Sequence, residues 1–141
     1  MPLISITRLR VRSWRYLPAF LFYALSSARQ ASRSDGNLAV KLLRDANNTW
    51  WTSTSWDGEN SMRKFMLMKP HGAAMRKLLE WCDEAALVHW SQPEPALPTW
   101  TEAHRRLQSE GRTSKVLHPS PAHVAFQIAP PAGERGEVRI K

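Results

Sequence analysis

Apolar and polar residues alternate along three stretches of the first 56 residues, and this pattern predicts strands. The stretches are residues 3–12, 37–45 and 48–56. The short sequence Ala-Asn-Asn between the last two is typical of a hairpin turn. Between residues 17 and 34 apolar side chains instead recur every three or four positions, which predicts an amphipathic helix.

The pattern changes again between residues 57 and 92. Asp57 stands where a helix cap is expected, and apolar residues recur at helical spacing on both sides of Pro70, which interrupts the helix. Residues 84–92 then predict a fourth strand. The order β-α-β-β-α-β predicts an α+β protein with a ferredoxin-like antiparallel sheet and both helices on one face.

The third predicted strand, Asn-Thr-Trp-Trp-Thr-Ser-Thr-Ser-Trp, carries tryptophan on both of its faces. Helices on one side of a sheet leave the other side bare, and a large bare apolar face is unusual in a monomer. We therefore expect the second face to be buried against a symmetric copy of the chain, which predicts a homodimer.

The sequence after the fourth strand predicts an appendage to the same domain. A proline-rich connector at 93–98 precedes a helix at 99–111, in which Thr99 and Glu102 fit a capping box. Residues 122–128 alternate apolar and polar side chains, which predicts a strand. The expected division is a barrel domain at 1–92, a helix-and-strand appendage at 93–128 and a flexible tail at 129–141.

Composition narrows the classes of partner. The net charge is +8, and the first 46 residues hold eight Lys or Arg against two Asp or Glu. Such a region attracts nucleic acid, anionic lipid or an acidic ligand, and a solvated basic edge explains it equally well. The single cysteine, Cys82, rules out an internal disulfide and a thiolate metal site, so we expect a cytoplasmic location and no metal.

Residues 8–31 imitate a secretion signal, with a basic start and an apolar middle. Their helical stripe continues beyond the apolar run, as in a globular amphipathic helix, and the run is too short to span a bilayer. We therefore expect no membrane partner. The sequence carries no recognised RNA-binding signature, so we expect no nucleic-acid partner either.

Several side chains are candidates for chemistry. His71, beside Pro70 at the start of a helix, is the catalytic candidate because histidine titrates near neutral pH. Trp51, Trp56 and Trp90 could wall an apolar pocket, although ordinary core packing explains them as well. The other ligand-binding candidates are Arg8 and His89 on neighbouring predicted strands and His104 in the terminal helix.

The run from Gly36 to Trp90 resembles the antibiotic-biosynthesis-monooxygenase superfamily of dimeric α/β barrels. The likeness is greatest to a bacterial branch related to spheroidene monooxygenase, a carotenoid-oxidising enzyme. It rests on a hairpin that ends in Trp56-Asp57, a Met-Arg-Lys-Phe-Met helix, His71 at the next helical segment and the terminal run 100–123.

The resemblance implies a homodimer whose sheets face each other, with a pocket between each sheet and its own helices. Members of the superfamily oxidise aromatic polyketides with O2 and no cofactor. Haem-degrading members use Asn, Trp and His, whereas the first strand here offers Ser5 and Thr7 in place of Asn. We expect a monooxygenase-like protein that binds and oxidises a small apolar or aromatic molecule. The alternatives are ligand binding without turnover and a haem-using oxygenase, so the expected cofactor is none or haem.

Overall fold

The computed structural model describes residues 1–68 and 71–141, with side chains for 1–68 and 76–141. The strands are β1 (Leu3–Val11), β2 (Asn37–Asp45), β3 (Thr49–Trp56), β4 (Cys82–Ser91), β5 (Arg112–Thr113) and β6 (Glu137–Arg139). The helices are a short 3-10 turn η1 (Trp14–Tyr16), α1 (Leu17–Arg33), α2 (Glu59–Leu67), α3 (His71–Trp81), α4 (Trp100–Glu110) and α5 (Pro121–Val124).

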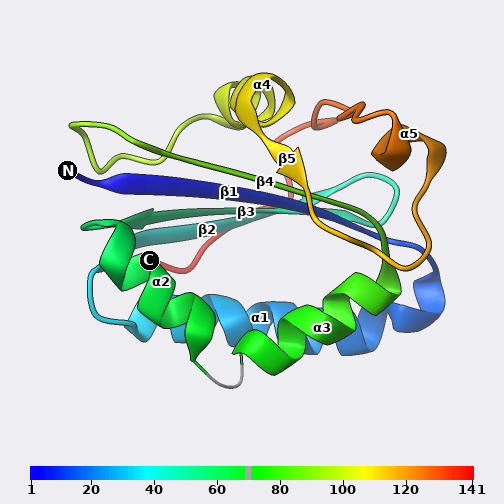
Figure 1. Cartoon of the computed structure of the whole chain (residues 1–141), viewed down its shortest axis with the longest axis horizontal. Coiled ribbons are helices and arrows are strands. Elements are labelled where there is room, and N and C mark those ends of the chain that lie inside the picture. The colour runs from blue at the N-terminus through cyan, green and yellow to red at the C-terminus, as the bar shows by residue number, and fades with distance from the viewer. Residues whose placement is uncertain (69–70) are drawn as a thin grey trace.

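The strands form one antiparallel sheet in the order β5-β4-β1-β3-β2-β6. Its four long strands and α1, α2 and α3 confirm the predicted α+β, ferredoxin-like arrangement. Helices α1, α2 and α3 lie against one face of the sheet, while α4 and α5 lie over the other (Figure 1). Within the described residues, no helix has both the length and the apolar character that crossing a bilayer requires.

Local sequence explains most element boundaries. Asn47 and Asn48 both adopt positive φ, a backbone conformation that asparagine tolerates and that a tight β2–β3 turn requires. Thr99 accepts a hydrogen bond from the amide of Glu102 and caps α4 as predicted. The predicted cap at Asp57 is wrong. Gly58 occupies the cap position of α2, and the Asp57 carboxylate instead accepts a hydrogen bond from the Ser61 hydroxyl.

The face of the sheet toward α1, α2 and α3 carries two separate apolar clusters. One joins β1, β2 and β3 to α1 and α2 and includes Leu3, Val40, Leu42, Trp56, Met62 and Phe65. The other lies at the opposite end of the strands, where the end of β1 pairs with the start of β4, and joins them to α1 and α3. It includes Leu9, Val11, Phe20, Leu78 and Cys82. The two clusters pack the helix layer against the sheet at both ends of the strands.

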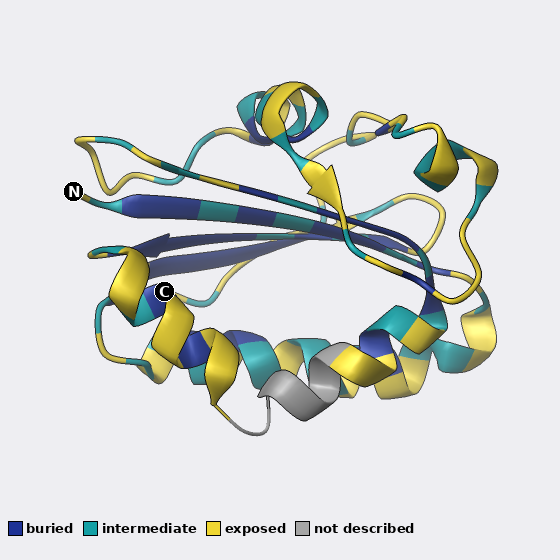
Figure 2. Ribbon diagram, viewed as in Figure 1, coloured by how far each residue is buried: buried dark blue, intermediate teal, exposed yellow. Residues whose placement is uncertain are grey.

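The second face of the sheet is covered by the chain itself. Its buried cluster, in which Ile4, Ile6, Leu43, Trp51, Ala86 and Val88 pack with Trp100, Ala103, Leu107 and Ile128, brings α4 and the C-terminal segment onto β1 to β4. Figure 2 shows the strands buried between the two outer layers. This face therefore needs no symmetric copy to cover it, and the homodimer stays a prediction from the resemblance alone.

Two predictions for the C-terminal region are wrong. Residues 122–128 form no strand, because Ser120 accepts a hydrogen bond from the amide of His123 and starts α5, and Phe126 then adopts positive φ. Residues 137–139, predicted within a flexible tail, form β6 and pair with the free edge of β2. An unpaired strand edge can recruit three residues without any strong hydrophobic pattern in them.

Candidate functional site

Four predicted site residues lie on the face of the sheet that α4 covers: Arg8, Trp51, Trp90 and His104. Trp51 is fully buried, and its ring centre lies 6.4 Å from those of Trp100 and His104, both in edge-on contact. The guanidinium carbon of Arg8 lies 5.7 Å from the Trp51 ring centre. The Trp51 indole also donates a hydrogen bond to Asp45 over 3.0 Å. These contacts fill the space beside Trp51, so this tryptophan is core and leaves no opening for a ligand.

Arg8 belongs to a buried ion-pair network rather than to a binding site. It donates to Glu84 over 2.7 Å, and Arg10 and the Ser120 hydroxyl also donate to this carboxylate. Burial alone would raise the pKa of Glu84, but the hydrogen bonds from Arg8, Ser120 and Arg10 outweigh it and hold the pKa below its usual value. Because Ser120 caps α5, the network ties the C-terminal segment to β4.

Trp90 and His104 have similar anchoring roles. The guanidinium carbon of Arg106, on α4, lies 4.5 Å from the centre of the Trp90 ring. His104 Nε2 lies 2.7 Å from the carbonyl oxygen of Ile128, which can only accept, so the ring donates this hydrogen bond. A depression of about 140 Å³ lies beside Trp100 and His104. That volume is below the range of about 300–1,000 Å³ typical of small-molecule sites.

The remaining predicted residues lie on the side of the helix layer. Trp56 packs against Phe65 of α2, with ring centres 5.3 Å apart, and its indole donates to Thr54. His89 is exposed on β4. The side chain of His71 lies outside the described residues, so its predicted catalytic role stays a prediction.

A polar band crosses the sheet between the two apolar clusters of the helix side. The register places Ser5 opposite Thr54 and His89, and Thr7 opposite Thr52. Ser5 and Thr7 lie on the same side of β1 as Leu3 and Leu9, which face the helices. Their direct partners on β3 and β4 share that face. Ser5, Thr7 and Thr52 remain partly exposed although β1 and β3 are interior strands. The helix layer therefore leaves polar side chains at the centre of this face partly exposed.

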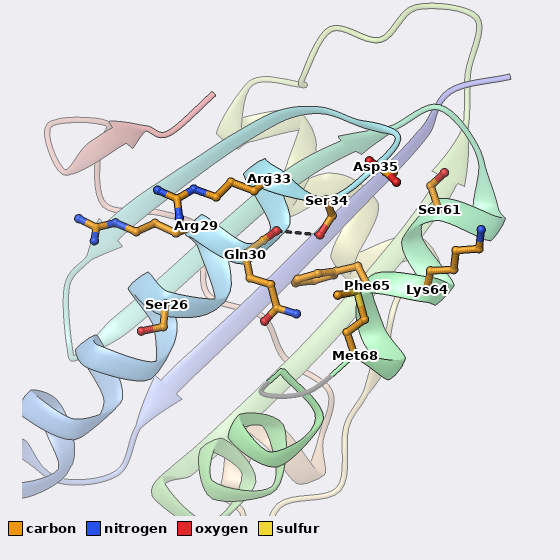
Figure 3. Close-up of a pocket in the computed structure, with 10 residues that line it drawn as sticks. All are labelled: Ser26, Arg29, Gln30, Arg33, Ser34, Asp35, Ser61, Lys64, Phe65 and Met68. Atoms are coloured by element: carbon orange, nitrogen blue, oxygen red, sulfur yellow. Dashed lines mark hydrogen bonds between the residues drawn. The ribbon is translucent and has the colours of Figure 1, made fainter.

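A cavity of about 550 Å³ lies between α1 and α2. Figure 3 shows its lining, in which Gln30 of α1 points toward Phe65 and Met68 of α2. The other lining residues are Ser26, Arg29, Arg33, Ser34, Asp35, Ser61 and Lys64. The lining thus combines an apolar aromatic and thioether surface with amide, hydroxyl and charged groups, as small-molecule sites do.

The amide of Gln30 is the most unusual group of this pocket. Both its nitrogen and its oxygen are buried and have no hydrogen-bond partner in the described part of the chain. Leaving such a group without a partner costs roughly 1–3 kcal/mol, so native proteins rarely do so without a reason. The sequence carries no signal for Gln30, because a glutamine beside the apolar stripe of a helix is an ordinary boundary residue.

The charged residues that line the pocket are mostly basic. Arg29, Arg33 and Lys64 line it, and none of them makes an ion pair within the described residues. Asp35 is the single acidic residue among the described lining residues. Unpaired cations around a partly enclosed cavity raise the local concentration of anions, so the pocket favours a ligand with negative charge or an electron-rich oxygen.

Two other kinds of chemistry find no support in the described residues. Burial raises the pKa of Cys82 to about 12, so its thiol is uncharged at neutral pH and unreactive as a nucleophile. Among the described residues, no group of three or more His, Cys, Asp or Glu side chains is arranged to hold a metal ion. The chemistry available is thus hydrogen bonding, charge stabilisation and exclusion of water.

Solved structures show what the fold is similar to, whereas no curated protein matches the sequence. A protein from Nitrosomonas europaea, proposed to be an antibiotic biosynthesis monooxygenase, superposes with a TM-score of 0.60 at 14% identity over 67% of this chain and 93% of its own. SnoaB, a cofactor-independent oxygenase from Streptomyces nogalater, superposes with a TM-score of 0.53 at 19% identity over 70% of this chain and 98% of its own. A conserved protein from Methanosarcina mazei Go1 superposes with a TM-score of 0.59 at 12% identity, over 65% of this chain and 93% of its own.

These identities are low, so the likeness concerns the fold alone. Each neighbour is covered almost completely, while about a third of this chain has no counterpart in it. The residues after β4 make up about that share of the sequence. A family model described as "Domain of unknown function (DUF3291)" matches residues 26–127, well over half of the sequence, and the chain belongs to this family.

Proposed function

We propose that the pocket between α1 and α2 binds a small, partly apolar molecule with an oxygen-bearing or anionic group, and that the protein oxidises this molecule with O2. The observation that carries the proposal is the unpartnered, buried amide of Gln30 beside the apolar surface of Phe65. A ligand oxygen would accept a hydrogen bond from this amide, while an aromatic ring of the ligand would pack on Phe65.

The surrounding charges support an acidic aromatic substrate such as a phenol. Arg29, Arg33 and Lys64 would stabilise its conjugate base, which is the electron-rich form that reacts with O2. Where such a substrate also carries a CH2 group in a ring fused to its aromatic rings, the reaction turns this CH2 group into a carbonyl. One oxygen atom of O2 enters the substrate, and the other leaves as water with the two hydrogens. The substrate supplies the electrons, which agrees with the fold likeness to a cofactor-independent oxygenase.

Haem remains an alternative from the sequence, as does the closer relation to spheroidene monooxygenase. The described lining residues include no histidine, cysteine or tyrosine that could hold the iron, and His71 lies outside the described side chains. The proposed reaction therefore makes no use of haem. The predicted homodimer is not needed either, because α1, α2 and the residues next to them in one chain supply every described lining residue.

Oxygen uptake tests the proposal. The purified protein is mixed with a hydroxylated anthrone, a three-ring phenolic ketone with a reactive CH2 group, without added cofactor. We expect consumption of one O2 per anthrone and a fall of at least tenfold in kcat/KM for Gln30→Leu. The matched control is Gln127→Leu, because Gln127 is exposed and belongs to the other side of the sheet. Equal rates for both variants would remove Gln30 from the reaction.

Ligand binding without turnover is the second candidate, favoured by the lack of any described nucleophile or metal cluster. Trp56 stacks on Phe65, so its fluorescence should respond when a ligand packs against Phe65 in the pocket. Saturable quenching by the anthrone that disappears in Trp56→Phe, without oxygen uptake, would establish a binding protein. Absence of both quenching and oxygen uptake would contradict the proposed site.

A further inference from the structure

The outward side of α1 carries an unusual ridge. Pro18, Phe22, Leu25, Arg29 and Arg33 are all exposed and fall within about 80° of one another on a helical projection. The exposed fraction is 67% for Phe22 and 43% for Leu25, and Trp14 of η1, just before α1, is 73% exposed. We name the α1 ridge as Trp14, Pro18, Phe22, Leu25, Arg29 and Arg33.

The ridge lies in a part of the chain without negative charge. Residues 1–34 hold six arginines and no Asp or Glu. Arg15, Arg29 and Arg33 are exposed and make no ion pair within the described part of the chain. Large apolar side chains and free guanidinium groups therefore share one surface.

The neighbouring end of α2 extends this surface. Lys64 and Met68 line the same pocket as Arg29 and Arg33, on the side opposite α1, and α1 and α2 belong to the same layer (Figures 1 and 3). Large apolar side chains are exposed there as well: Met66, Leu67 and Met68, with Leu67 the most exposed of the three at 85%. The helix layer thus presents bulky apolar groups together with cations.

We propose that the α1 ridge docks on the surface of an anionic lipid bilayer. Trp14, Phe22 and Leu25 enter the region between headgroups and acyl chains, and the arginines pair with lipid phosphates. An interfacial helix needs an apolar side and nearby positive charge, and it need not be long enough to span the bilayer. This docking departs from the sequence-based expectation of no membrane partner.

Charge and shape favour a bilayer over the other occupants. In a symmetric dimer the same surface meets its copy, so a ridge that itself contains no Asp or Glu would bring its arginines close to those of the copy. Nucleic acid would satisfy the arginines, but its phosphate backbone offers no apolar surface to bury Phe22 and Leu25. A bilayer supplies both the phosphates and the apolar interior.

The docking is independent of the proposed oxidation, although the two surfaces adjoin. Arg29 and Arg33 belong both to the α1 ridge and to the lining of the pocket between α1 and α2. An apolar ligand dissolved in the bilayer would therefore meet the pocket at the docked surface. Loss of oxidation with membrane binding intact, or the reverse, would separate the two proposals.

Vesicle flotation tests the docking. The full chain is mixed with vesicles of phosphatidylcholine alone or with about 30% phosphatidylglycerol added, at low and at high salt. We expect binding to the anionic vesicles at least tenfold tighter than to the neutral ones, and weaker at high salt. Phe22→Ser should weaken binding about tenfold, and Arg15→Glu should do so at low salt.

Matched variants on other parts of the molecule control for folding and total charge. Val124 on α5 is 75% exposed and lies over the other face of the sheet, so Val124→Ser should bind as the native chain does (Figure 1). Arg112→Glu on exposed β5 makes the same charge change as Arg15→Glu, but Arg15 adjoins Trp14 of the α1 ridge in η1 whereas Arg112 belongs to β5, so Arg112→Glu should bind more tightly.

Several outcomes would overturn the proposal. One is equal binding to neutral and anionic vesicles. Another is equal weakening by Phe22→Ser and Val124→Ser. A dimer in analytical sedimentation that Phe22→Ser dissociates, without vesicle binding, would assign the ridge to a second copy. Binding of a short DNA duplex that Arg15→Glu abolishes, again without vesicle binding, would assign it to nucleic acid.

Discussion

The two faces of the sheet differ in how fully the chain covers them and in how well their buried polar side chains are paired. On the α4 face, Arg8 and Lys41 are buried, and each meets a carboxylate and an aromatic ring. On the helix face, the amides of Gln30 and Asn37 are buried without a partner in the described chain. The first face is closed by its own appendage, whereas the second combines an open polar band with a cavity.

Unsatisfied groups occur on both faces, so their number does not separate a site from a core. The hydroxyls of Ser53 and Ser55 are also buried without a partner, on the α4 face. Neither serine lines a described cavity, whereas Gln30 lines a cavity of about 550 Å³. A buried polar group indicates a binding function only where a ligand has room to reach it.

The largest expected effect concerns the closed face. Trp100 is 1% exposed, contacts Trp51 and donates to Glu137 over 2.7 Å. Trp100→Ala should lower the free energy of unfolding by about 3–5 kcal/mol, measured by urea denaturation. Phe65→Ala, on the open face, should cost less because Phe65 already borders a cavity. Equal losses of unfolding free energy in the two variants would show that the two faces are packed equally well.

The Arg8–Glu84 pair gives the next largest effect. Glu84→Gln keeps the shape of the side chain but leaves Arg8, whose side chain is 5% exposed, without the carboxylate that it pairs with. We expect a loss of about 3 kcal/mol in the free energy of unfolding. The exposed pair of Glu59 and Arg63 on α2 is the control, and Glu59→Gln should cost less than about 1 kcal/mol. A cost for Glu84→Gln as small as that of the control would show that the pair does not hold the appendage.

Acid should loosen the closed face before the helix face. The pKa values of Glu84, Glu102 and Glu137 are lowered, by hydrogen bonds from Arg8, Arg105 and Trp100 among others, and that of Glu102 falls to about 2. Their contribution to stability is complete above the unfolded value of 4.5 and is lost as pH falls through the lowered values.

Asp83 acts in the opposite sense, because burial raises its pKa. Glu84 and Glu137 pair with the buried cations of Arg8 and Lys41 and lose this attraction when they are protonated, so we still expect a net loss of stability in acid. Hydrogen exchange between pH 5 and about pH 2 should therefore show α4 and β6 opening before α1. Earlier opening of α1 would contradict the assignment of these carboxylates to the closed face.

Local patterns predicted the framework because short-range rules decide it. The hairpin of β2 and β3, the start of α1 near Pro18 and the Thr99 cap each depend on a few neighbouring residues. The cover of the second face could not be predicted in this way. The spacing of Trp100 and Leu107 indicated that α4 has an apolar side that packs against another surface. Apolar periodicity does not say whether that surface belongs to the same chain or to a second one.

The candidate site was harder to predict than the fold. Aromatic and basic residues on adjacent strands suggested a pocket, and Trp51 and Arg8 do meet, but as packed core and ion pair. The pocket between α1 and α2 depends on Gln30, whose only distinction is the absence of a partner. Such an absence becomes visible only when the positions of all neighbouring groups are known.

The smallest expected effect has the opposite sign to the others and sharpens the contrast most. Gln30→Leu replaces an unpartnered buried amide by an apolar group of similar size, so the free energy of unfolding should rise by up to about 1 kcal/mol. The same change should weaken binding of a phenolic ligand, measured by quenching of Trp56 fluorescence. A gain in stability together with a loss of binding is expected where a protein maintains a costly group for its ligand. A loss of stability would instead mean that the amide has a structural partner, and the open face would then be as complete as the closed one.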